Sequence, residues 1–265
     1  MPSVNWLQYP SGGRLNGADP VPRWPLERVL DGAAEAGFTA VGLDHFTLRG
    51  KPVDVLGPLL RERGLVCSDV GVLPIGRSEA HAVAELLARV ASATGAPTCI
   101  AAFFAPLERA EAVRVLDGCA DVLAGVGVRI ALEFASYGGL TRLEDAVVLC
   151  DAVGWERCGL LIDAWHFFHT GADWSALRAL RGNQIVLVHV NDGRADVGGD
   201  LVHAGRYSRV PPGDGTFPLA EFARALDAAG YRGPLSVEVL SDSIRLQPPV
   251  DGARILRTYI ELNLL

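Results

Sequence analysis

Short apolar runs alternate with longer stretches of helical periodicity along the whole chain. The runs are bounded by turn residues and show little strict alternation of apolar and polar positions, which is typical of strands covered by helices on both faces. Strands are expected at residues 4–7, 40–46, 65–73, 98–104, 129–135, 159–164, 185–190 and 235–240. The pattern therefore predicts a parallel sheet.

The stretches between these runs carry apolar residues at helical spacing. Helices are expected at residues 26–36, 53–63, 80–93, 107–123, 143–153, 175–180, 219–229 and 251–264. Several stop at or near a glycine, as expected for helix C-caps; these are Gly37, Gly64, Gly95, Gly125, Gly154 and Gly230. Repeated β-turn-α units without a polar linker predict one (β/α)8 TIM barrel over residues 1–265 more than an open doubly wound sheet.

Composition narrows the class of protein. Hydrophobic residues make up 49% of the chain and charged residues 21%, which excludes disorder. The net charge of −7 disfavours a nucleic-acid-binding surface. The five cysteines form no C-x-x-C pair, the N-terminus resembles no signal peptide, and no run is long and apolar enough for a membrane span. We therefore expect a soluble cytoplasmic protein without a nucleic-acid or membrane partner.

Four successive strand ends carry residue types that bind metals. Glu133, Asp163, His189 and Glu238 each follow mostly apolar residues at the end of the fifth to eighth expected strands. In a barrel these ends meet on one rim. Three carboxylates in an apolar wall repel one another and lose hydration unless a cation neutralises them. The sequence therefore predicts one divalent metal ion, with Mn²⁺ favoured, Mg²⁺ or Co²⁺ as alternatives, and zinc less favoured without thiolates.

Two further residues are candidates for contact with a substrate. His166 follows Asp163 by three positions, so its imidazole is expected beside the metal without binding it. Arg209 lies in the long connection at 193–217, before a turn at 211–215, where its guanidinium can bind a hydroxyl or carboxylate above the metal. Arg206 is a second candidate in the same loop. Each has an ordinary alternative, a packed histidine or a solvated loop arginine.

Other strand ends give less specific signals. Asp44 and His45 close the second strand, where a structural role is favoured over one in the site. Aromatic residues near strand ends can line a small polyol pocket or simply pack the rim; they are Trp6, Tyr9, Phe103, Phe104, Trp165 and Phe168.

The four strand ends, the Asp-x-x-His spacing and the segment RVPPGDG at 209–215 resemble the xylose isomerase-like barrel superfamily of sugar isomerases and epimerases. The resemblance covers nearly the whole chain. It implies that Glu133, Asp163, His189 and Glu238 hold one divalent ion and that His166 and Arg209 contact substrate. It also implies that Glu133 and Glu238 are an acid/base pair on opposite faces of the substrate carbon. Endonuclease IV, a member with three zinc ions that needs further histidines, is disfavoured because the expected strands at 65–73 and 98–104 lack histidine, His45 is the only candidate in the earlier strands, and the chain is acidic.

The chemistry of that superfamily predicts the reaction class. A hydroxyketone that chelates a cation through adjacent oxygens has a more acidic neighbouring C–H, and a carboxylate can remove this proton. We expect an isomerase or epimerase that acts on a small polyhydroxylated keto substrate, a ketose or keto-cyclitol, through an enediolate. The alternatives are a lyase of the inosose dehydratase or dehydroshikimate dehydratase type, and a non-catalytic barrel subunit. A homo-oligomer is compatible with the sequence.

Overall fold

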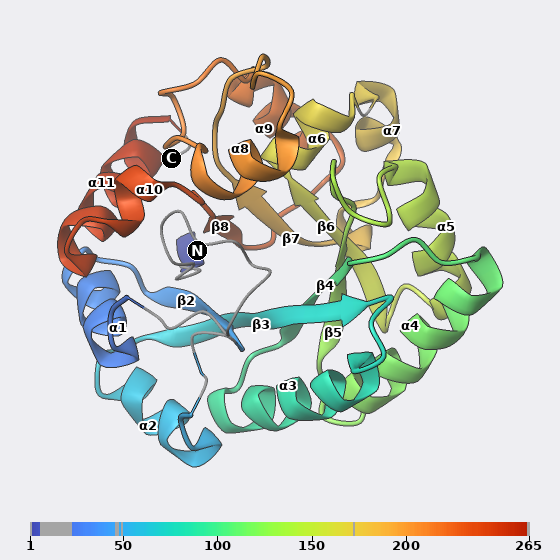
Figure 1. The fold of residues 1–265 in the computed structure, drawn as a ribbon, viewed down its shortest axis with the longest axis horizontal. Helices are drawn as coiled ribbons and strands as arrows, with labels where there is room; N and C mark the ends of the chain where they lie inside the picture. The colour runs from blue at the N-terminus through green and yellow to red at the C-terminus, as the bar shows by residue number, and fades with distance from the viewer. Residues whose placement is uncertain (1, 6–22, 46–47, 49, 172, 264–265) are drawn as a thin grey trace.

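The computed structural model describes residues 2–5, 23–45, 48, 50–171 and 173–263. Its eight parallel strands form a closed barrel in sequence order, and β8 pairs with β1. The strands are β1 (Pro2–Asn5), β2 (Ala40–Asp44), β3 (Val66–Ile75), β4 (Thr98–Phe103), β5 (Arg129–Glu133), β6 (Cys158–Asp163), β7 (Ile185–Val190) and β8 (Leu235–Val237). The predicted (β/α)8 barrel is confirmed (Figure 1).

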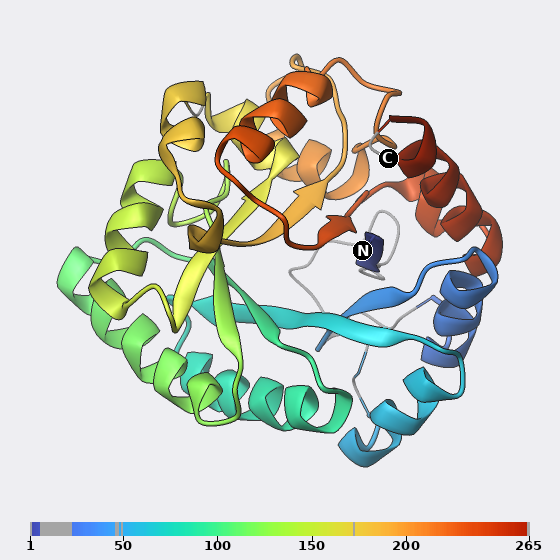
Figure 2. The same cartoon turned by 180° about the vertical axis from the view of Figure 1, so that it is seen from behind.

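Helices surround the barrel, as the two opposite views show (Figure 2). Those that the periodicity predicted are α1 (Leu26–Glu35), α2 (Leu56–Arg61) with the preceding 3₁₀ turn η1 (Val53–Val55), α3 (Ala80–Thr94), α4 (Arg109–Ala124), α5 (Leu143–Val153), α7 (Trp174–Ala179), α9 (Leu219–Ala228) and α11 (Pro249–Asn263). A second 3₁₀ turn, η2 (Gly182–Gln184), precedes β7. None of the helices in the described ranges has the length and apolar character needed to cross a bilayer.

Three short helices were not predicted. They are α6 (Ala164–Thr170), which begins directly after β6, α8 (Leu201–Tyr207), which lies within the long connection expected at 193–217, and α10 (Asp242–Arg245). With four to seven residues each, they span two turns or fewer, so apolar periodicity gives only a weak signal, although the equally short α7 was predicted. The long connection is therefore partly helical, and α8 lies on the side of the barrel where β6 and β7 end (Figure 1).

Helix α4 ends directly before Gly125, as predicted, but Gly125 does not take the left-handed conformation typical of a glycine C-cap. Gly125 follows α4 with a φ of −58°, which is a right-handed helical value, and the left-handed residue is Gly127 with a φ of 76°. The chain makes one more turn after α4, in which the Gly127 N–H donates to the Ala124 carbonyl at 3.0 Å. The residue that ends the turn, rather than the first glycine, takes the conformation that favours glycine.

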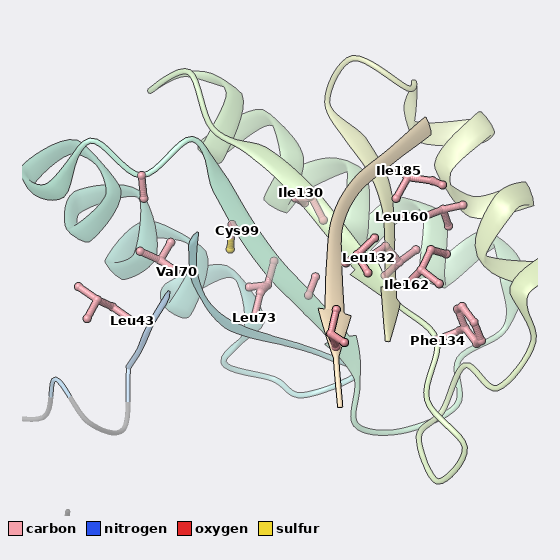
Figure 3. Close-up of a cluster of buried hydrophobic side chains, with 14 of the residues drawn as sticks. Leu43, Val70, Leu73, Cys99, Ile130, Leu132, Phe134, Leu160, Ile162 and Ile185 are labelled. Carbon is pink, nitrogen blue, oxygen red and sulfur yellow. The ribbon is translucent and has the colours of Figure 1, made fainter. Parts of the chain in front are cut away.

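Alternation along the strands divides their residues into two sets. One set, which includes Leu132, Leu160 and Ile162, packs between the strands and the surrounding helices and forms the outer core, as the side chains in Figure 3 illustrate. A separate small cluster, Ile100, Ala131, Leu161 and Leu187, fills the barrel interior. Side chains two residues apart in a strand share a face. Glu133, Asp163 and His189 therefore project to the interior just beyond Ala131, Leu161 and Leu187.

Candidate active site

Side chains from four successive strands meet at the carboxyl end of the barrel. Ligand atoms of Asp163, His189 and Glu238 lie within 4.8 Å of one another, and so do those of Glu133, Asp163 and His166. The two groups share Asp163. The structure thus brings together all four residues predicted to bind a metal, and it places His166 beside them.

Asp163 is at the centre of this arrangement and is fully buried. It ends β6 and caps α6, because its side chain accepts the backbone N–H of His166 at 3.2 Å. The amide of Asn191 donates to both carboxylate oxygens at 3.2 Å. Burial disfavours the charged carboxylate, but Arg209 and the nearby histidines outweigh burial and hold the pKa of Asp163 below its ordinary value. Asp163 is therefore ionised.

Arg209 is buried among the carboxylates, at 1% exposure. Its Nη1 donates to Asp163 Oδ2 at 2.9 Å and to Glu238 Oε2 at 3.1 Å, and its Nε donates to the Gly205 carbonyl at 2.7 Å. Its guanidinium also lies 5.6 Å from the centre of the Trp165 ring. Arg209 therefore supplies one positive charge between two of the carboxylates, in addition to the divalent ion that the sequence predicts.

His189 is the predicted imidazole ligand and is also buried. Its Nδ1 lies 3.6 Å from Asp163 Oδ2 and 3.4 Å from Glu238 Oε2. Neither ring nitrogen has a hydrogen-bond partner among the described residues. Burial lowers the pKa of His189, but Glu238 and Asp163 outweigh burial and raise it well above its ordinary value. An unpartnered imidazole nitrogen facing two carboxylates, with a third carboxylate nearby, is a donor set that fits a divalent cation.

Glu133 and His166 form the other side of the site. His166 Nε2 lies 3.9 Å from Glu133 Oε1, and His166 Nδ1 accepts the backbone N–H of Ser136 at 3.1 Å. The proton of the neutral ring is therefore assigned to Nε2, facing Glu133. Burial lowers the pKa of His166 to about 4, so the ring is neutral at pH 7. Burial, followed by repulsion from Asp163 and Glu238, raises the pKa of Glu133 to about 8.

Asp192 holds the segment that carries Arg209, a role that sequence reasoning missed. Its carboxylate accepts the backbone N–H groups of Gly193, Gly213 and Phe217 at 2.7, 2.9 and 3.0 Å. Its backbone also exchanges two hydrogen bonds of 3.0 Å with Val210, the residue after Arg209. The sequence offered one signal, an acid three residues after His189 and two residues beyond the end of β7.

Tyr137 is a further residue at the site that the sequence did not identify. Its ring lies 5.0 Å from the His166 ring in an edge-on arrangement, and the Arg206 guanidinium lies 5.6 Å from its centre. A Cβ built on Gly205 would lie 2.6 Å from Tyr137 Cε1. Helix α8 therefore approaches the site closely through Gly205, with Arg206 packed on Tyr137.

The remaining candidates have mixed outcomes. Trp165 and Phe168 pack with Phe217, with ring centres 6.0 and 4.6 Å apart, whereas Phe104 is 42% exposed. Asp44 is buried at the end of β2, and His45 Nδ1 lies 3.2 Å from the Gly71 carbonyl. Phe103 is buried in the outer core. Trp6 and Tyr9 lie outside the described residues.

Comparison with known proteins gives relatives at modest identity. The chain is 34% identical over 140 residues to a 3-dehydroshikimate dehydratase of Pseudomonas aeruginosa, covering 51% of this chain and 22% of that protein. It is 32% identical over 127 residues to an inosose isomerase of Bacillus velezensis, covering 47% of this chain and 44% of that protein. The matched part thus spans less than half the length of these relatives.

Solved structures share the fold over almost the entire chain. The crystal structure of an IolI protein with a bound zinc atom has a TM-score of 0.84 at 18% identity, covering 98% of this chain and 97% of that one. A D-psicose 3-epimerase from Clostridium cellulolyticum has a TM-score of 0.70 at 16% identity, covering 98% and 97%. The family described as the xylose isomerase-like TIM barrel matches residues 30–259. The chain therefore belongs to the xylose isomerase-like TIM barrel family.

Proposed function

We propose that this protein is a divalent-metal-dependent isomerase or epimerase that acts on a small polyhydroxylated keto compound, a ketose or keto-cyclitol. The observation that carries the proposal is the pair of overlapping ligand groups that share Asp163, one containing Glu133 and the other His189 and Glu238. Glu133, Asp163, His189 and Glu238 would hold the ion. Three carboxylates and one imidazole suit Mn²⁺, Mg²⁺ or Co²⁺, and the structural neighbour that binds a zinc atom supports a divalent ion.

The ion, when bound, supplies a positive charge that polarises the carbonyl and makes the adjacent C–H more acidic. Glu133 and Glu238 belong to two different ligand groups, which share Asp163. One carboxylate removes the proton from one face of the substrate carbon, and the other returns a proton to the opposite face for epimerisation or to the adjacent carbon for isomerisation. Neutral His166 donates its Nε2–H to a substrate hydroxyl, and Arg209 keeps Asp163 and Glu238 ionised.

A lyase is the second candidate, and the match to a 3-dehydroshikimate dehydratase at 34% identity favours it. The same carboxylate removes the C–H proton, a C=C bond forms, and the β-hydroxyl, which accepts a hydrogen bond from His166 Nε2–H, leaves as water with the proton that the carboxylate has removed. Proton removal is common to both reactions, so only the fate of the carbanion distinguishes them.

We further propose a small-molecule partner and a cytoplasmic location. The five cysteines are free and buried, as expected in a reducing compartment. The net charge of −7 opposes binding of nucleic acid.

The test is product analysis with a defined metal content. The purified protein is analysed for bound metals and then incubated with ketoses, inososes and a dehydroshikimate in D₂O with added Mn²⁺. Deuterium in a product of unchanged constitution identifies an isomerase or epimerase, whereas a new C=C absorbance with loss of water identifies a lyase. Full turnover by metal-stripped protein would refute the proposal.

A pair of variants links the reaction to the site. Glu238→Gln is expected to lose bound metal and turnover, because it removes one charged ligand. Glu144→Gln removes an exposed carboxylate from the first turn of α5 and is the matched control. Equal loss in both variants, or in neither, would contradict the assigned site.

A further inference from the structure

Polar atoms from three strands of the barrel interior lack hydrogen-bond partners. Asp69 Oδ1 in β3, both ring nitrogens of His189 in β7 and Ser236 Oγ in β8 are buried and reach no partner among the described residues. Folded proteins satisfy nearly all buried polar groups, using ordered water where no protein group is near. These three strands enclose the same barrel interior, so one hydrogen-bonded group within it can satisfy all of these atoms.

The Asp69 carboxyl projects into the barrel. Val70 belongs to the outer core, so its neighbour Asp69 faces the interior. A Cβ built on Gly42, the partner of Asp69 across β2, would lie 2.5 Å from Asp69 Oδ1. The missing side chain at Gly42 therefore makes room for this carboxyl. Ser68 Oγ donates to the other oxygen, Oδ2, at 2.7 Å, which leaves Oδ1 as the free acceptor.

The Nε2 atom of the His189 ring can donate a hydrogen bond to such an acceptor. Its Nδ1 faces Asp163 and Glu238, so the Nε2 on the far side of the ring points away from these carboxylates. Ser236 is the register partner of His189 across β7 and β8. Burial raises the pKa of Asp69, and His189 is the strongest of the neighbours that oppose this rise, so the two side chains are within electrostatic reach.

We propose that Asp69 is a positioning residue for His189, whose Nε2–H is bound by Asp69 Oδ1 and Ser236 Oγ through ordered water in the barrel interior. Metal-binding histidines generally donate their second ring N–H to a carboxylate, a carbonyl or water, which fixes the tautomer and the ring orientation. Here the interaction leaves Nδ1 unprotonated and directed at the ion. The inference rests on the proposed function, because it needs His189 to bind the metal.

Two substitutions of Asp69 with opposite expectations test this role by Mn²⁺ titration calorimetry. Asp69→Leu has a similar volume and no acceptor, and it is expected to weaken Mn²⁺ binding by about 10–100-fold. Its metal-free form should melt at the wild-type temperature or higher, because the desolvation cost of a buried carboxyl has been removed. Asp69→Asn keeps an acceptor and should bind Mn²⁺ as the wild type does. Ser68→Ala, which removes only the donor to Oδ2, is the control.

Wild-type Mn²⁺ affinity in a folded Asp69→Leu variant would overturn the inference. The wild-type protein provides a second measurement that does not depend on the variant folding. In ¹⁵N NMR spectra of the Mg²⁺-loaded chain, which has six histidines, His189 should be the Nε2–H tautomer with slow solvent exchange. A proton on Nδ1 would overturn the inference.

The two proposals fail in different ways. A wild-type chain that binds no divalent ion refutes the proposed function, and this inference falls with it. A wild-type chain that binds Mn²⁺ and is indifferent to Asp69→Leu refutes this inference alone.

Discussion

Replacing Arg209 with methionine tests whether this cation holds the metal-free site together. Methionine keeps much of the packing volume but removes the charge between Asp163 and Glu238, which Nη1 contacts at 2.9 and 3.1 Å. Removing one partner of a buried ion pair costs about 3–5 kcal/mol, because the other charge is left uncompensated. With about 2.1 cal/mol/K of unfolding entropy per residue, this corresponds to a Tm lower by about 5–9 °C for a chain of 265 residues.

The assay is thermal unfolding in metal-free buffer at several pH values. Arg209 helps to depress the folded-state pKa of Asp163 and Glu238, so the stability from these carboxylates is present above their unfolded pKa and is lost as the pH falls through the folded pKa. The deficit of Arg209→Met should therefore be largest near pH 7 and shrink in acid. Added Mn²⁺ should restore part of it, since the ion replaces the missing charge.

A surface arginine provides the control for this experiment. Arg178 is 46% exposed and lies 3.7 Å from Glu221, so Arg178→Met should cost less than about 1 kcal/mol. An Arg209→Met variant that melts at the wild-type temperature in metal-free buffer would refute the reasoning. It would mean that the carboxylates are neutral or hydrated without the guanidinium.

Three further substitutions test other parts of the site. Because the folded-state pKa of Glu133 is raised to about 8, the metal-free wild type should lose stability as the pH rises from about 4.5 to 8. Glu133→Gln should abolish this pH dependence of the unfolding free energy, measured by urea titration. An unchanged pH dependence would assign it to another group. Asp192→Ala leaves three backbone N–H groups without their acceptor, so it should lower the free energy of unfolding in urea by more than about 2 kcal/mol. It should also lower kcat, because the segment that carries Arg209 loses its anchor. A wild-type unfolding free energy together with a wild-type kcat would rule out the role of Asp192 in holding the loop. Gly205→Ala places a Cβ 2.6 Å from Tyr137 Cε1 and should lower Tm. Gly118→Ala in α4, where nothing lies within 4 Å of the added Cβ, is the control and should raise Tm slightly. Equal changes of Tm in the two variants would show that α8 has room to move.

The sequence predicted the barrel well because strand and helix periodicity is a local property. Apolar runs such as 129–135 and 185–190 carry their own signal within a few residues, and the parallel topology then brings every strand end to the same rim. Glu133 and His189 were therefore recognisable without coordinates. The helix α8 was not, because a seven-residue helix in a polar loop depends on what it packs against.

The amino-acid sequence by itself determined the order of the eight strands and of the eight longer helical segments, and which residues lie at the ends of the last four strands, since apolar runs bounded by turn residues and a spacing of 3.6 residues are local patterns. The tertiary structure alone decided that Arg209 lies between Asp163 and Glu238, 46 and 29 residues away in the chain. It also decided that Gly42 makes room for Asp69, an acid within a mostly apolar strand. The physical reason is that a charge can be buried only where other groups pair with it. These groups are distant in the sequence, so no local sequence pattern predicts their positions.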